Sequence, residues 1–320
     1  MNRSVFIIPY FGKFNNYFQL FLNSCEKNPD FDWLIFTDDK RAFNYPSNVH
    51  VYYTTFELLQ ERIKHLFDFD IILHQPYKLC DYKIAYGYIF REYIRDYEFW
   101  GYCDIDMLFG RISKFITDEI LTQNDRILER GHLTLFRNCE QINKLFMNDH
   151  KALFIDYRYA FTTKYCCHFD EFEPWNQVMQ DMKLRQWVVP IFADISSDSY
   201  RFVLEYGNHK KNKQIYLWRD GILSRYYLEN GKIYQDEWCY IHLQKRKMIL
   251  EDSIDNMEYW IVPNKFIAYS EAGHMEKFID MYGIDEFYLN RKIGRIKEIL
   301  ENILNGALLF RIKRIRIRDK

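Results

Sequence analysis

The feature that most constrains the fold is an alternation of strand-like and helix-like segments through the first hundred residues. Val5–Tyr10, Trp33–Asp38 and Val49–Tyr53 are apolar runs of strand length. Asn15–Cys25 and Phe56–Phe67 lie between or after them and place their apolar residues at helical spacing. Such alternation predicts an α/β fold whose sheet is mainly parallel at its start.

Two carboxylates follow the next expected strand. A helix is expected over Lys83–Tyr97, and the apolar run that starts at Phe99 ends in Asp104-Ile105-Asp106. Side chains alternate along a strand, so Asp104 and Asp106 should point the same way at its end. Ligands of α/β sheets collect at the carboxyl ends of strands, and paired carboxylates suit Mg²⁺ or Mn²⁺. Such an ion can hold a diphosphate and offset charge on a departing phosphate. A surface turn or a helix cap is the alternative interpretation.

The second half of the chain has a different pattern. Short strands with turns at Asp220-Gly221 and Asn230-Gly231 predict a meander, and a last strand is expected over Trp238–Leu243. Beyond residue 250 an apolar stripe between Ile293 and Leu304 predicts an amphipathic helix. We therefore expect one domain over residues 1–250 and a helical C-terminal extension over residues 251–320.

The composition of the chain limits the partners that we expect and suggests where in the cell the protein lies. The net charge of −1 provides no global field for nucleic acid, so no nucleic-acid partner is expected. The seven cysteines include no CxxC pair, and we interpret them as reduced thiols of a cytoplasmic protein. The N-terminus runs directly into a strand and predicts no signal peptide, and no segment has the length of a membrane span. Residues 311–320 hold six basic residues and one acidic residue, which suggests peripheral contact with the inner face of the plasma membrane.

Five blocks, taken in order, resemble a known family: Ile8–Gly12, Trp33–Asp39, Pro76–Lys83, Trp100–Asp106 and Tyr240–Lys245. The chain is similar to bacterial GT-A-type glycosyltransferases of capsular and other surface-polysaccharide biosynthesis, and is distantly similar to glycogenin-like enzymes. The resemblance implies a GT-A-like (Rossmann-like) mixed, mainly parallel sheet flanked by helices. The late block departs from the glycogenin-like pattern, because its Gly and Pro-Trp companions are missing.

The resemblance also implies roles for individual residues. Asp104, Asp106 and His242 would hold Mn²⁺ or Mg²⁺, although His242 also suits a hydrogen-bonded core histidine. A nucleotide-sugar donor, with a UDP-sugar favoured, would contact Pro9, Tyr10, Phe11, Asp38, Lys78, Asp81, Lys83, Asp104 and Lys247. The expected catalytic residues are Asp170 and Glu171 on the acceptor side and Lys245 at the departing diphosphate.

These expectations together describe a metal-dependent hexosyltransferase. It would move a hexose from the nucleotide sugar to a surface-polysaccharide or lipid-linked glycan acceptor, with retention of configuration slightly favoured. The alternative is a nucleotide-sugar-binding or nucleotidyltransferase-like protein on the same fold. A nucleotidyltransferase usually has a Gly-rich phosphate loop after its first strand, and here that loop contains Gly12 alone.

Overall fold

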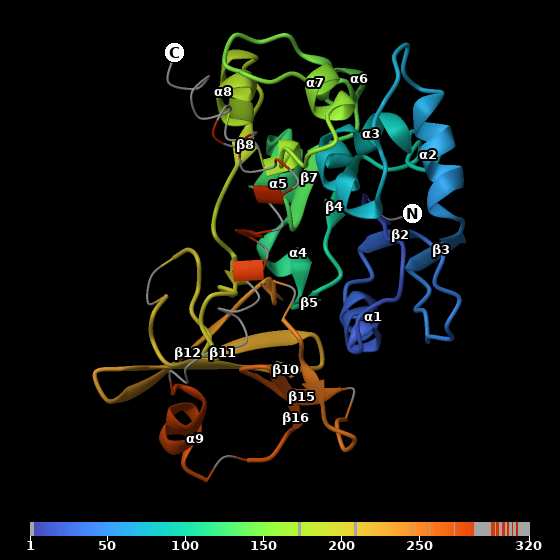
Figure 1. The fold of residues 1–320 in the computed structure, drawn as a ribbon. Coiled ribbons are helices and arrows are strands. Elements are labelled where there is room, and N and C mark those ends of the chain that lie inside the picture. Colours follow the sequence, from blue (N-terminus) through green and yellow to red (C-terminus); the bar gives the residue numbers. More distant parts are fainter. Residues whose placement is uncertain are drawn as a thin grey trace.

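The computed structural model describes residues 3–171, 174–207, 210–244, 246–255, 257–271 and 273–284, with single residues and pairs between 296 and 312. These residues form a mixed α/β structure with three sheets, of seven, six and three strands. Figure 1 shows the seven-stranded sheet with its helices in one part of the molecule and the six-stranded sheet in another.

The seven-stranded sheet contains the strands expected from the start of the chain. Its order is β3-β2-β1-β4-β7-β6-β8. β1 pairs in parallel with β2 and β4, β2 with β3, and β6 with β8, whereas β7 is antiparallel to both its neighbours. The strands are β1 Ser4–Pro9, β2 Phe31–Thr37, β3 Val49–Tyr53, β4 Phe99–Cys103, β6 Arg126–Arg130, β7 Leu133–Arg137 and β8 Gln186–Trp187. The predicted α/β class is confirmed, and the sheet is mixed.

Both faces of this sheet are buried, which explains why its strands are continuous apolar runs. Along β1, Phe6 and Ile8 enter one hydrophobic core while Val5 and Ile7 enter the core on the opposite face. This is the period-two alternation of a strand with a core on each side. Because β1, β2 and β4 are parallel, their carboxyl ends lie at the same edge of the sheet.

Two predicted helices are present, one before β2 and one after β3. They are α1 Phe18–Glu26 and α2 Phe56–Lys64, and the Thr55 hydroxyl caps α2 by accepting a hydrogen bond from the Leu58 N–H.

The prediction of one helix over Lys83–Tyr97 is wrong. The chain instead forms a 3-10 helix, η1 Pro76–Ala85, and one turn of α-helix, α3 Tyr86–Ile89. Burial of this segment against the sheet overrides its local helical spacing.

The six-stranded sheet contains the expected meander. Its order is β12-β11-β10-β15-β16-β14, and the turns fall at Asp220-Gly221 and Asn230-Gly231, where all four residues have positive φ. The strands are β10 Gln214–Arg219, β11 Ile222–Glu229, β12 Lys232–Glu237, β14 Ile249–Leu250, β15 Glu258–Val262 and β16 Lys265–Ala268. β15 and β16 lie beyond residue 250, so that region is not helical throughout. The boundary at residue 250 stays a prediction, and this sheet takes strands from both sides of it.

The remaining short sheet joins distant parts of the chain. It consists of β5 Met107–Phe109, β13 Tyr240–His242 and β9 Phe192–Asp194, with β13 in the middle. The other helices are α4 Ile112–Phe115, α5 Asp118–Gln123, α6 Glu140–Asn143, η2 Leu145–Met147, α7 Tyr157–Thr162, η3 Phe169–Glu171, α8 Pro174–Asp181 and α9 Met275–Tyr282. Among the described residues, no helix is long and apolar enough to cross a membrane. Much of the helix expected between Ile293 and Leu304, and most of the basic tail, lies outside the described residues.

Candidate metal centre

The two aspartates of Asp104-Ile105-Asp106 occupy the short connection between β4 and β5. β4 is buried along its whole length and pairs with β1 and β7. The Asp104 N–H continues this pairing by donating to the His132 carbonyl at 3.0 Å. The carboxylates therefore stand at the carboxyl end of a buried strand, while Asp104 and Asp106 keep 36% and 17% of their side chains exposed.

The structure brings His242 to these carboxylates. β13 pairs antiparallel with β5, directly after Asp106, and the Leu243 N–H donates to the Asp106 carbonyl at 2.8 Å. As a result, His242 Nε2 lies 3.4 Å from Asp106 Oδ1 and 3.8 Å from Asp104 Oδ2. We call Asp104, Asp106 and His242 the carboxylate–histidine cluster; their ligand atoms lie within 4.8 Å of one another.

Asp194 orients His242 from the other side. β9 is parallel to β13 with Asp194 in register with His242, and Asp194 Oδ1 lies 2.8 Å from His242 Nδ1. The Gln244 amide donates to the same oxygen at 2.9 Å, which fixes the carboxylate. A carboxylate on one ring nitrogen directs the other nitrogen toward a ligand, and this is the usual outer support of a metal-binding histidine. Sequence analysis missed Asp194, although its position at the end of a short strand was a usable signal.

The electrostatics of this group favour a charged histidine beside the carboxylates. Burial opposes the charge on His242, but Asp106, Asp194 and Asp104 outweigh it and raise the pKa of His242 to about 10. Burial and the neighbouring charge of His242 hold the pKa of His132 well below its usual value. The two imidazole rings lie 4.5 Å apart, so His242 is the positive partner of the pair.

Lys83 and Asp170 extend the site on the side of Asp104. Lys83 Nζ lies 2.8 Å from Asp104 Oδ1, 3.7 Å from Asp170 Oδ2 and donates to the Gly131 carbonyl at 2.7 Å. Burial works against the charge on Lys83, but Asp104 and Asp170 raise its pKa well above the ordinary value. Burial raises the pKa of Asp170 to about 8 despite the proximity of Lys83. Glu171 instead accepts a hydrogen bond from the Gly131 N–H at 2.9 Å.

The loop after β1 lies on the Asp106 side. Tyr10 is half-buried, and burial followed by the charge of Asp106 raises the pKa of its hydroxyl. Asp38, which follows β2, accepts a hydrogen bond from the Gly12 N–H at 2.7 Å and so shapes this loop. Pro9 ends β1 and Phe11 is packed in the core.

Other expected site residues lie in different surroundings. Lys78 and Asp81 form an ion pair whose side chains are 1% and 0% exposed. Lys247 is exposed, and Lys245 lies outside the described residues. The donor-binding roles of Lys78, Asp81 and Lys247 remain predictions, and Lys83 is the lysine that the structure places at the carboxylates.

The donor set fits a divalent cation. Carboxylate oxygens suit Mg²⁺ and Mn²⁺, and an imidazole nitrogen suits transition metals, so two carboxylates with one histidine favour Mn²⁺ over Mg²⁺. The support of His242 by Asp194 strengthens this fit because it directs Nε2 toward the two aspartates.

A cavity of about 440 Å³ lies elsewhere, beside β3 and α2. Its lining includes Tyr52, Tyr53, Arg62 and Tyr93, and none of the expected site residues. We therefore assign the chemistry to the sheet edge and not to this cavity.

The fold and the site thus define a mixed α/β protein with a candidate metal centre at a sheet edge. Residues 6–270 match a family of unknown function, DUF6625, and the chain belongs to that family. No curated protein matches it. Among solved structures, it is similar to the galactosyltransferase LgtC in complex with donor and acceptor sugar analogues, with a TM-score of 0.32 and 10% identity over 60% of this chain and 75% of that chain. At this level the likeness carries no argument, and function is inferred from the site.

Proposed function

We propose that this protein is a metal-dependent glycosyltransferase of the GT-A type. It transfers a hexose from a nucleotide-diphosphate sugar, with UDP as the favoured nucleotide, to a surface-polysaccharide or lipid-linked glycan. The same proposal includes three further points. The transfer retains the configuration of the sugar, the protein acts in the cytoplasm, and its basic tail contacts the membrane.

One observation carries this proposal: Asp104, Asp106 and His242 converge although they come from distant parts of the sequence. The carboxylates follow β4, and the histidine arrives on β13 with its second nitrogen held by Asp194. The two carboxylates that face its outer nitrogen stay partly exposed, so an ion could reach them. The arrangement therefore supports a cation-binding role.

The residues around the cluster have complementary tasks in this proposal. Asp106, Asp104 and His242 would hold the ion, which would supply positive charge for a diphosphate and for the departing nucleotide. Asp194 holds the Nδ1 proton of His242, so Nε2 is the nitrogen that would give up its proton to a bound ion.

Lys83 and Asp170 supply groups beside the ion-binding carboxylates. Lys83 stands next to Asp104 as a fixed positive charge for a phosphate or sugar oxygen. Asp170 lies behind Lys83, where its raised pKa of about 8 lets it hold a proton near neutral pH.

The test is release of UDP or GDP from a panel of nucleotide sugars in the presence of Mn²⁺. Asp106→Ala should lower the rate at least about 100-fold, because it removes a ligand of the ion. Asp68→Ala is the matched control, since Asp68 is an exposed aspartate paired with Arg158. If the wild-type protein releases no nucleotide from any donor, the proposal is overturned, and binding of UDP without turnover would favour a nucleotide-sugar-binding protein.

A further inference from the structure

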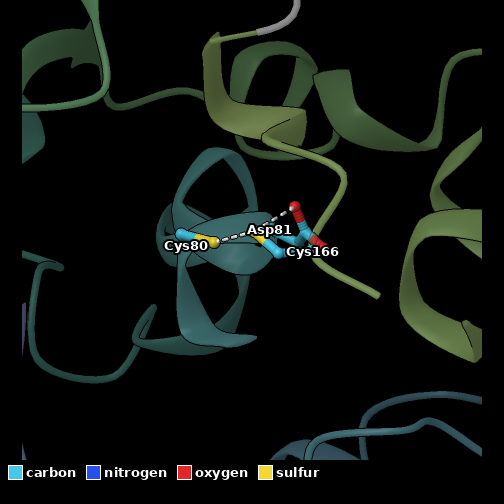
Figure 2. Close-up of side chains that lie close together, drawn as sticks. All are labelled: Cys80, Asp81 and Cys166. Atoms are coloured by element: carbon cyan, nitrogen blue, oxygen red, sulfur yellow. Dashed lines mark hydrogen bonds between the residues drawn. The ribbon is translucent and has the colours of Figure 1, made fainter. Parts of the chain in front are cut away.

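A second group of potential ligands lies on η1, away from the carboxylate–histidine cluster. Cys80 and Asp81 come from η1, and Cys166 comes from the segment that leads into η3; we call these three residues the cysteine cluster. Figure 2 shows the two sulfur atoms facing each other. Their separation is 2.6 Å, and both side chains are partly accessible.

The spacing of the sulfurs excludes a shared metal ion. A zinc–sulfur bond is about 2.3 Å, so sulfurs 2.6 Å apart would subtend an angle of only about 70° at the metal, against about 109° for a tetrahedron. A disulfide bond of about 2.05 Å is much nearer to the observed separation. The pair is therefore arranged for a sulfur–sulfur bond.

The Asp81 carboxylate holds this pair in place, and its oxygens are already bound by other groups of the protein. Its carboxylate pairs with Lys78 at 2.5 Å and accepts hydrogen bonds from the N–H groups of Cys167 and Phe169 at 2.9–3.0 Å. The positive charge of Lys78 would also repel a cation. These bonds hold the backbone after Cys166 against η1, and Lys78 donates to the Tyr165 carbonyl just before it, which together keep the Cys166 sulfur beside Cys80.

We propose that Cys80 and Cys166 are a redox modification site and form an intramolecular disulfide by exchange with a small-molecule disulfide such as oxidised glutathione. One thiolate attacks the glutathione disulfide and releases one glutathione thiolate. The second protein thiolate then attacks the mixed disulfide and releases the other. Two protein thiols are oxidised, one glutathione disulfide is reduced to two thiols, and the two protons pass to the released thiolates.

The bond would join two segments that both reach the candidate metal centre. η1 carries Lys83, and the segment after Cys166 carries Asp170. Closing the long loop between residues 80 and 166 restricts the unfolded chain, so the oxidised protein should melt about 5 °C higher than the reduced protein. This inference does not depend on the proposed activity, because both readouts are made without substrate.

The test treats the full-length protein with oxidised glutathione at about pH 8.5 for several hours. Peptide mapping by mass spectrometry without reduction should find the Cys80 peptide linked to the Cys166 peptide, and dithiothreitol should reverse the link. Cys80→Ser and Cys166→Ser should each abolish the link and the rise in melting temperature. Cys139→Ser is the matched control, because its partly buried thiol belongs to no cluster among the described residues.

Either of two results would overturn the proposal. One is a wild-type protein in which both thiols remain reduced or only mixed disulfides with glutathione accumulate. The other is a link that joins Cys80 to the neighbouring Cys167 instead. The mapping uses the wild-type chain, so it decides the question even if a serine variant folds poorly.

Discussion

The carboxylate–histidine cluster and the cysteine cluster look alike as collections of ligand atoms but differ in what those atoms already bind. In each, three potential metal ligands lie within 4.8 Å of one another. In the first, Asp104 and Asp106 remain partly exposed and His242 is turned toward them by Asp194. In the second, the only carboxylate is sealed in an ion pair and the sulfurs touch.

This difference teaches that proximity of ligand types does not define a metal site. A site needs lone pairs that the protein has not used and outer contacts that direct them at a common point. In the first cluster the carboxylates of Asp104 and Asp106 stay partly exposed, and an ion bound there would displace the proton from His242 Nε2. In the second cluster, the Asp81 carboxylate already accepts hydrogen bonds from the backbone and holds two segments together.

The largest expected effect is a loss of stability when the buried ion pair of the cysteine cluster is removed. Lys78→Met leaves Asp81 charged and buried without its partner, which should lower the free energy of unfolding by about 3–5 kcal/mol. Urea unfolding measures this change. Lys114→Met, which removes an exposed partner of Glu237, serves as the control and should have a much smaller effect. Equal losses in the two variants would contradict the structural role of the buried pair.

The next effect tests the support of the carboxylate–histidine cluster. Asp194→Ala removes the acceptor on His242 Nδ1 and should weaken Mn²⁺ binding by about 10–100-fold, as measured by calorimetric titration. Asp194→Asn keeps a side-chain oxygen and should retain part of the affinity. Asp68→Ala should bind Mn²⁺ as the wild type does. Unchanged affinity in Asp194→Ala would show that His242 needs no orienting carboxylate.

The last effect builds up with each pH unit and concerns Asp170, which follows the cysteine cluster in sequence and reaches Lys83 beside the carboxylates. Its pKa is raised to about 8 when folded, against an ordinary value of 3.8. Between these values the unfolded chain loses the proton that the folded chain keeps, so the contribution of Asp170 to stability is complete below about pH 4 and lost as pH rises to about 8.

Asp170→Asn should remove this dependence. Relative to the wild type, the variant should gain about 1.4 kcal/mol of stability for each pH unit between about pH 4 and pH 8 in urea unfolding experiments. Asp68→Asn should show no such gain. A difference between wild type and Asp170→Asn that stays constant with pH would mean that Asp170 is ionised in the folded protein.

Much of the first sheet could be predicted because it depends on local patterns. β1, β2 and β3 are apolar runs, and Thr55 is a recognisable helix cap. The helix expected to end at Tyr97 could not be excluded, because only tertiary burial shortens it to η1 and α3.

The candidate site was accessible to sequence analysis only in part. The spacing of Asp104 and Asp106 at the end of an expected strand predicts a metal site. The family resemblance predicts His242 as a further ligand. Asp194 could not be paired with His242 from sequence, since their contact depends on β9 lying parallel to β13. The approach of Cys80 to Cys166 depends in the same way on long-range packing of η1 against η3.

The position of β13 between β5 and β9 has a consequence for biosynthesis. A ribosome delivers Asp104 and Asp106 long before it delivers His242, and β13 has to enter between two strands already made. The nascent N-terminal sheet therefore exposes two acidic side chains without their histidine. The proposed cation site is therefore complete only after β13 has been synthesised and has paired with β5 and β9.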